Sequence, residues 1–243
     1  LDHKVKLLQS NTGFKSSMDS VLLAAACPAT NKQTILELGC GVGGAAFCLL
    51  YREKELHYAG IDIDEGYIEL ARLNADLNQV VGQCSISMSS VTEYRCDTAQ
   101  LRFDHVICNP PYYEAGKHIP SPEEHLAKAR GHVDEDISLK DWIDCAFHNL
   151  QPRGSFTIIH QAEKLDAILR DMGKRFGAVE VFPIYTKEGR AAKRVVVRGY
   201  KDRLSPLAIR QAIYLEDKDG KPTEHANLLL REGMSFDTLL KDK

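Results

Sequence analysis

The sequence predicts a doubly wound α/β protein whose mostly parallel sheet has about seven strands and ends in an antiparallel hairpin. Short apolar segments suited to buried strands alternate with segments suited to helices from residue 34 to residue 175. This alternation is typical of parallel strands joined by helical crossovers. The last two apolar segments, 178–185 and 193–199, are joined by the short segment Thr186–Ala192 and predict a hairpin at the sheet edge.

Residues that start or stop regular structure delimit the expected elements. Ser17 suits the start of a helix, Asp19 suits its first turn, and Pro28 ends it. Helices are expected at 17–27, 44–51, 65–78, 138–150 and 162–175, and strands at 34–38, 56–62, 84–88, 103–108, 154–160, 178–185 and 193–199. A short alternating stretch within residues 1–12 predicts a small hairpin strand. The long polar segment 113–135 is too irregular for a simple connection and predicts a functional loop.

Length and composition fit one domain. The 243 residues can bury one sizeable core, with an N-terminal extension at 1–30, a core at 31–200 and a polar C-terminal appendage at 201–243. The seven cysteines include no Cys-x-x-Cys pair, which argues against a disulfide framework or a zinc ribbon, and no metal site is expected. No segment approaches the roughly twenty apolar residues that would span a membrane. We expect a cytoplasmic protein with reduced thiols.

A glycine-rich turn follows the first predicted strand. The strand ends in Glu37 and Leu38, the turn contains Gly39 and Gly41, and a second strand ends in Asp62 about twenty residues further on. Glycines allow a tight turn and let a ligand approach the backbone, and a carboxylate at the next strand end can accept hydrogen bonds from both ribose hydroxyls. Through Gly44, the turn also matches a dinucleotide fingerprint, so NAD binding is an alternative. Glu37 argues against it, because a carboxylate there would repel a pyrophosphate and tolerate a sulfonium.

The segment Asn109-Pro110-Pro111-Tyr112 follows the predicted strand at 103–108. The prolines remove two backbone donors and stop the strand, so that its last polar groups face outward. The Asn109 amide oxygen and the Pro110 carbonyl can accept the two protons of an exocyclic NH2 group, while the Tyr112 ring can stack on a planar substrate. The segment therefore indicates a site for an aromatic amine or an amide.

These residues carry a resemblance to S-adenosylmethionine-dependent amino-methyltransferases. The resemblance rests on Glu37-Leu38-Gly39-Cys40-Gly41, Asp62 and the Asn-Pro-Pro-Tyr segment. More narrowly, the chain resembles the bacterial tRNA adenine-N6 methyltransferase family that modifies an adenine beside the anticodon of valine tRNA. The narrower resemblance lies in Gly13-Phe14-Lys15, Asp19–Ala25, Ser121-Pro122, Ala129–His132 and Lys193-Arg194-Val195. It implies a Rossmann-like class I methyltransferase fold, S-adenosylmethionine as cofactor and tRNA as partner.

The resemblance also implies roles for individual residues. On the substrate side, Asn109 and Pro110 would polarise the adenine amino group and Tyr112 would stack on the base. On the cofactor side, Glu37 would lie near the methionine end, Gly39 and Gly41 would line the path of the ligand, and Asp62 would hold the ribose, with Asp19 as a further candidate near the methionine moiety. Related enzymes usually carry an acidic residue after the third strand, where this chain has Ser90, a weaker acceptor for the cofactor's adenine amino group.

Basic residues that could bind RNA cluster in two predicted loops. The net charge is −3 and the pI is about 6.3, so binding to phosphates requires a local basic patch. The candidates are Lys117 and Arg130 in the first loop, and Arg190, Lys193 and Arg194 in the second. Both loops are expected near the strand ends that carry the other candidate residues.

Alternative functions stay open from the sequence. The same Asn-Pro-Pro-Tyr chemistry would suit N-methylation of a protein glutamine amide or of guanine N2 in rRNA. Two alternatives of a different class are an NAD-binding oxidoreductase and a non-catalytic RNA-binding module. The sequence leaves the oligomeric state open.

Overall fold

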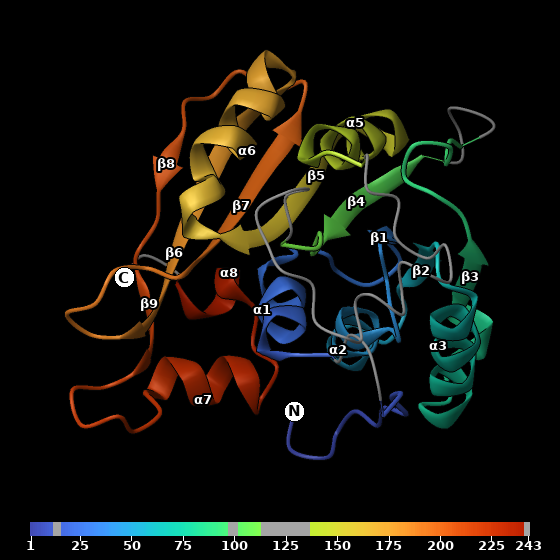
Figure 1. Ribbon diagram of the computed structural model, residues 1–243, viewed down its shortest axis with the longest axis horizontal. Coiled ribbons are helices and arrows are strands. Elements are labelled where there is room, and N and C mark those ends of the chain that lie inside the picture. Colours follow the sequence, from blue (N-terminus) through green and yellow to red (C-terminus); the bar gives the residue numbers. More distant parts are fainter. Residues whose placement is uncertain (12–15, 97–101, 113–136, 241–243) are drawn as a thin grey trace.

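A computed structural model of the chain describes residues 1–11, 16–96, 102–112 and 137–240. Within these residues one nine-stranded sheet has the order β3-β2-β1-β4-β5-β7-β6-β8, and β9 also pairs with β6 (Figure 1). The strands are β1 (Thr34–Leu38), β2 (His57–Asp62), β3 (Cys84–Met88), β4 (Phe103–Cys108), β5 (Leu150–Gln161), β6 (Phe176–Lys187), β7 (Arg194–Lys201), β8 (Ala208–Ile209) and β9 (Ile213–Glu216). The first five strands are mutually parallel, and β7 is antiparallel to both β5 and β6.

Several helices, including α1 and α3, begin at residues whose side chains accept hydrogen bonds from free backbone amides. Ser17 accepts a hydrogen bond from the amide of Asp19, and Asp64 accepts one from the amide of Tyr67. The α-helices are α1 (Met18–Ala26), α2 (Gly44–Arg52), α3 (Glu65–Leu77), α5 (Leu139–Asn149), α6 (Leu165–Met172), α7 (Glu224–Leu230) and α8 (Phe236–Leu239). Short 3-10 helices are η1 (Val81–Gln83), η3 (Ala162–Lys164) and η4 (Gly173–Arg175).

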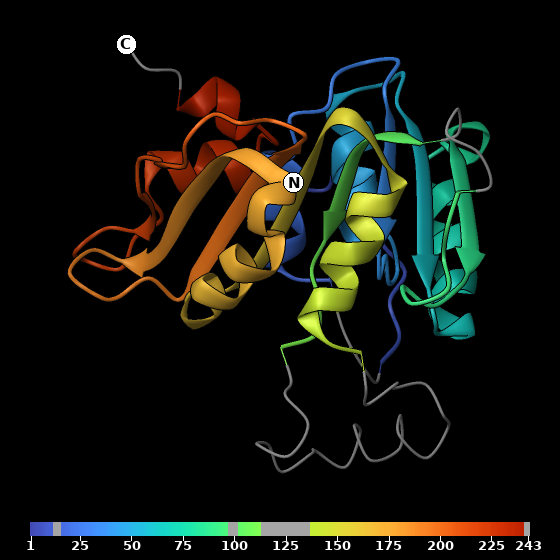
Figure 2. The same ribbon diagram turned by 90° about the horizontal axis from the view of Figure 1, so that it is seen from above.

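The sheet separates two hydrophobic cores. Helices α5 and α6 cover one face, whereas α1, α2 and α3, together with α7 and α8, cover the other (Figures 1 and 2). Neighbouring strand residues point into opposite cores because side chains alternate along a strand. Ile35 and Ile107 belong to the core of α1 and α2, and Leu36 and Val106 belong to the core of α5. The predicted doubly wound α/β fold is therefore confirmed.

Three predictions about individual elements need correction. The hairpin of β6 and β7 is present, and β7 lies between β5 and β6 in the sheet. Strand β6 also pairs in parallel with β8 and β9, so the sheet has nine strands instead of about seven. Residues 1–11 contain no strand. Instead, the Asn74 side chain on α3 forms hydrogen bonds with the backbone of Leu8, and the Asn78 side chain, directly after α3, donates to the carbonyl of Lys6. The helix predicted at 162–175 is η3, α6 and η4 in succession, interrupted at Gly173, whose φ is +52°.

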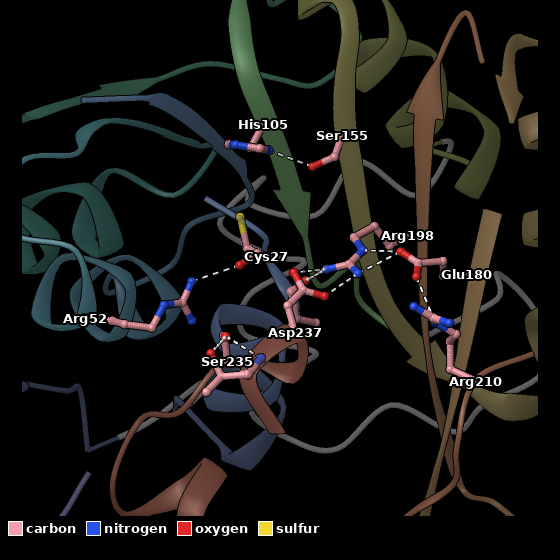
Figure 3. Close-up of polar contacts among 11 residues, drawn as sticks. Cys27, Arg52, His105, Ser155, Glu180, Arg198, Arg210, Ser235 and Asp237 are labelled. Carbon is pink, nitrogen blue, oxygen red and sulfur yellow. Dashed lines mark hydrogen bonds and ion pairs between the residues drawn. The ribbon is translucent and has the colours of Figure 1, made fainter. Parts of the chain in front are cut away.

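The C-terminal residues are tied to the sheet by a buried guanidinium. Arg198 on β7 is 2 % exposed and forms ion pairs with Glu180 on β6, at 2.7 Å, and with Asp237 on α8, at 2.6 Å (Figure 3). It also donates to the carbonyl of Ala26 at the end of α1. Arg52 of α2 donates to the carbonyls of Ala24 and Cys27. These contacts fix α1, whose first turn borders the candidate site.

Candidate active site

The candidate residues meet where the parallel strands end. Gly39 directly follows β1, Asp62 is the last residue of β2, Ser90 lies two residues beyond β3, and Asn109 directly follows β4. Because carboxyl ends of parallel strands lie at one edge of the sheet, the fold brings four sequence-predicted segments together there. Ligands of open α/β sheets bind at this edge.

The turn after β1 gives a ligand access to the backbone. Gly39 and Gly41 have φ angles of +65° and +51°, a region that disfavours residues with a Cβ atom. A Cβ on Gly39 would lie 2.7 Å from the Trp142 ring, so this glycine is needed for packing. A Cβ on Gly41 would meet nothing within 4 Å. Open space beside Gly41 fits the predicted approach of a cofactor.

Asp62 is held in one orientation by two backbone amides. Gly41 donates to its Oδ2 atom over 2.8 Å, and Asp64 donates to its Oδ1 atom over 3.0 Å. Burial raises the pKa of this carboxyl, and the two amides counteract the rise. Since each carboxylate oxygen can accept a second hydrogen bond, both atoms retain capacity for the two hydroxyls of a ribose.

Glu37 is the most perturbed carboxyl of the site. It is 4 % exposed, and the Tyr58 hydroxyl donates to its Oε2 atom over 2.7 Å. Burial raises the pKa of Glu37 to about 8, despite the hydrogen bond from Tyr58. The carboxyl is therefore largely protonated at neutral pH until a cation approaches it. Its place at the end of β1 suits a ligand that carries a positive charge.

Asn109 presents an acceptor that has no partner among the residues that the structure describes. Its Oδ1 atom is buried and has no hydrogen-bond partner within the described residues. Asn109 lines a small pocket together with Ser16, Ser20, Glu37, Gly39, Cys40, Val42 and Gly44. Leaving a buried amide oxygen unpaired costs free energy, so such an atom at a pocket wall indicates a missing donor. A substrate NH2 group is a donor of the required kind.

Tyr112 is fixed by three residues from other elements. Its hydroxyl donates to Oδ2 of Asp19 in α1 over 2.7 Å. The guanidinium of Arg194 lies over its ring, 4.8 Å from the centroid, and the His160 ring lies 4.8 Å away at 60°. Burial and the neighbouring Asp19 raise the pKa of Tyr112, and burial lowers the pKa of His160 to about 4. The hydroxyl and the imidazole are therefore both neutral at physiological pH.

The structure places the remaining candidates as follows. The Ser90 hydroxyl lies 2.8 Å from that of Thr92, at the carboxyl edge next to β2. Pro110 is buried, and Arg190 and Lys193 are exposed in the connection between β6 and β7. Lys117 and Arg130 lie outside the described residues. Asp19 is absent from the residues that line the pocket, and Arg194 pairs with it instead of facing solvent alone.

Several residues at the site were not predicted, among them Ser16, which lines the pocket, and Tyr58, His160 and Ser20. Tyr58 and His160 occupy strand positions that sequence patterns assign to packing, and Ser20 lies among the apolar residues of α1. Only Ser20 had a local signal, because it directly follows the candidate residue Asp19 in the same turn.

The chain has the fold of the class I methyltransferases and is an enzyme that uses S-adenosylmethionine. A family model, the methyltransferase small domain, matches residues 15–187. The chain belongs to that family. Within the described residues, none of the helices is both long and apolar enough to cross a membrane.

Several known proteins are similar to the chain over most of its length. A tRNA1(Val) (adenine(37)-N6)-methyltransferase of Pasteurella multocida is 25% identical over 85% of the chain and 84% of its own length. A relative of the same name from Shewanella sp. (strain MR-7) is 28% identical over 88% and 89%. Among solved structures, a predicted O-methyltransferase of Agrobacterium tumefaciens matches with a TM-score of 0.73 and 22% identity, over 90% of this chain and 98% of that one.

Proposed function

We propose that the protein transfers a methyl group to N6 of an adenine in tRNA. The observation that carries the proposal is the unpartnered, buried amide oxygen of Asn109 beside the pocket at the strand ends, where the described residues offer it no donor. An exocyclic amino group would supply the donor that this oxygen lacks. The relatives named as tRNA1(Val) adenine-N6 methyltransferases support an anticodon-loop adenine of valine tRNA as the substrate.

Asn109 and Pro110 would activate the amino group by hydrogen bonding. The lone pair of an adenine amino nitrogen is delocalised into the ring, so the nitrogen is a weak nucleophile. Oδ1 of Asn109 and the Pro110 carbonyl would each accept a hydrogen bond from the amino group. These two hydrogen bonds would favour a pyramidal nitrogen with a free lone pair. The proton that the nitrogen must lose would pass to water, because both acceptors are neutral. Orientation and polarisation are the contribution of these residues.

Tyr112 would hold the base in the plane that this attack requires. Aromatic side chains stack on bases that are splayed out of RNA loops. The hydroxyl of Tyr112 is anchored to Asp19, so the ring has a defined direction before the base enters. A neutral hydroxyl and a neutral imidazole from His160 make this wall of the site suitable for an uncharged ring.

On the cofactor side, S-adenosylmethionine would supply the methyl group from its sulfonium. Gly39 and Gly41 would line its path, Asp62 would accept from its ribose hydroxyls, and Glu37 would lie near its positively charged methionine end. Ser90 would accept from its adenine amino group. The open space at Gly41 and the retained acceptor capacity of Asp62 support these assignments.

Two exposed cations would bind the RNA backbone. Arg190 and Lys193 lie beside the start of β7, which pairs with the carboxyl end of β5 and so lies at the edge that carries the site. Lys117 and Arg130 are further candidates from the sequence. Phosphate contacts of this kind position an RNA without reading its bases.

The test is transfer of labelled methyl from S-adenosylmethionine to bulk tRNA, followed by nucleoside analysis. Labelled N6-methyladenosine is the expected product. Parallel reactions offer rRNA and cell protein as acceptors. Label in protein glutamine or in rRNA guanine, with none in tRNA, would contradict the adenine assignment and favour one of the other amino-group substrates. Transfer to valine tRNA but not to a valine tRNA without the anticodon-loop adenine would support the narrower assignment.

A further inference from the structure

The first turn of α1 contributes to two neighbouring parts of the site. Ser20, and Ser16 just before the helix, line the pocket beside Asn109. Asp19, between them in the same turn, directs its Oδ2 atom to the Tyr112 hydroxyl at 2.7 Å and to Nε of Arg194 at 3.0 Å. The two serine side chains therefore face the pocket, whereas the Asp19 side chain binds Tyr112.

The carboxylate of Asp19 is well placed to fix Tyr112. Its side chain is 10 % exposed, so the hydrogen bond from the tyrosine is protected from water. Arg194, 29 % exposed, supplies the positive charge that balances this carboxylate. The same guanidinium lies over the Tyr112 ring. The hydroxyl and one face of the ring of Tyr112 are thus both contacted by the Asp19–Arg194 ion pair. This ion pair joins α1 and β7 to the segment after β4.

We propose that Asp19 is a positioning residue for Tyr112, with Arg194 as its counter-ion, and is not a ligand of the cofactor. The inference rests on the proposed function, because it concerns how the stacking tyrosine is oriented. The sequence analysis predicted Arg194 as an RNA-binding cation. The inference instead assigns Arg194 to the substrate side of the active site.

The contact can be tested without RNA. Ring-labelled tyrosine followed by NMR, with the Tyr112 signal assigned by its loss in Tyr112→Phe, reports the surroundings of this ring. Asp19→Ala and Arg194→Gln should each move the Tyr112 signal, whereas Lys193→Gln, which removes the adjacent exposed cation, should leave it in place. An unmoved signal in Asp19→Ala would overturn the proposal.

Cofactor binding separates a positioning residue from a cofactor ligand. By calorimetry, Asp19→Ala should bind S-adenosylmethionine within about twofold of the unaltered protein, because the carboxylate is engaged elsewhere. A loss of about tenfold or more, with native stability retained, would make Asp19 a cofactor ligand and overturn the proposal.

A double-mutant cycle tests the catalytic consequence. Asp19→Ala should lower kcat for tRNA methylation about tenfold, since misplacing a substrate-orienting group costs rate. Tyr112→Phe keeps the ring and removes the hydroxyl. The double variant Asp19→Ala/Tyr112→Phe should lose no more kcat than the more impaired of the two single variants. Asp19→Asn keeps an acceptor for the hydroxyl and should recover part of the rate. Fully additive effects would overturn the proposal.

The two proposals fail in different ways. If the unaltered protein methylates no tRNA, the proposed function fails, while the NMR and calorimetric results still decide the role of Asp19. If tRNA is methylated and Asp19→Ala has an unchanged kcat, the positioning role fails and the proposed function stands.

Discussion

The backbone amide of Gly41 donates a hydrogen bond to Oδ2 of Asp62 over 2.8 Å, and this contact joins the turn after β1 to the end of β2. The contact aligns the turn that would line the path of S-adenosylmethionine with the carboxylate that would hold its ribose. Because the second carboxylate oxygen is bound by the amide of Asp64, the Asp62 side chain is oriented before any ligand arrives. Pre-orientation of this kind lowers the ordering cost of binding.

Replacing Asp62 should weaken cofactor binding. Asp62→Ala removes the predicted acceptor of two ribose hydroxyls, and hydrogen bonds to a charged group contribute about 1.5–3 kcal/mol each, so the Kd should rise roughly tenfold or more. Calorimetry with S-adenosylmethionine measures the change. Glu69→Gln, which alters an exposed carboxyl on α3, is the matched control. An unchanged Kd in Asp62→Ala would remove Asp62 from the cofactor site.

The affinity for S-adenosylmethionine should rise with pH between about 6 and 8. Burial raises the pKa of Glu37 to about 8, so below that pH the carboxyl is mostly protonated, and a nearby cation must displace the proton to gain the charge interaction. Binding should therefore release a proton at neutral pH, which calorimetry in buffers of different ionisation enthalpy detects. Glu37→Gln should abolish this part of the pH dependence. The same pH profile in both proteins would assign the effect to another group.

Replacing Asn109 should affect catalysis far more than cofactor binding or stability. Asn109→Ala removes the acceptor for the reacting amino group, and loss of one such polarising interaction costs about a hundredfold in kcat. The melting temperature should hardly change, because Oδ1 has no partner among the described residues. Asn109→Asp keeps an acceptor in place and should retain more activity than the alanine variant. Equal losses of activity and of S-adenosylmethionine binding in Asn109→Ala would make the residue structural.

Removing the exposed cations beside β7 should reduce the salt dependence of RNA binding. Each phosphate that the protein no longer neutralises lowers the slope of log K against log salt by about one. The combined Arg190→Gln and Lys193→Gln variant should therefore give a shallower slope in filter binding with tRNA. Lys174→Gln alters an exposed cation just before β6, at the opposite edge of the sheet, and should leave the slope unchanged. Equal slopes in all variants would exclude the β6–β7 connection from the RNA surface.

Much of the fold could be predicted because its signals are local. The strands predicted at 84–88 and 103–108 coincide with β3 and β4, since each is a short segment bounded by residues that stop a strand. Strand β8 has only two residues, both exposed, so no alternation marks it. Its pairing with β6 depends on a free strand edge that exists only after the sheet has formed. Strand β8 was unpredictable for that reason.

The candidate site divides in the same way. The glycine turn, Asp62 and Asn109 each stand at the end of an apolar segment, and parallel strands bring such ends together without further information. The role of Asp19 was uncertain because its partner Tyr112 is 93 residues away, and Arg194 is 175 residues away. No local pattern relates residues at those separations.

The doubly wound fold and the residues at the strand ends can be derived from the amino-acid sequence, because both follow from periodicity and from residue types that change the backbone. The methyltransferase class follows from the family resemblance that these residues carry. Two features needed the folded chain: the protonation of Glu37, whose pKa depends on the protein packed around it, and the pairing of Asp19 with Tyr112 and Arg194. Burial and long-range contact arise only when distant segments pack together. Burial and long-range contact therefore decide which candidate polar group is charged and which is already hydrogen-bonded to another side chain.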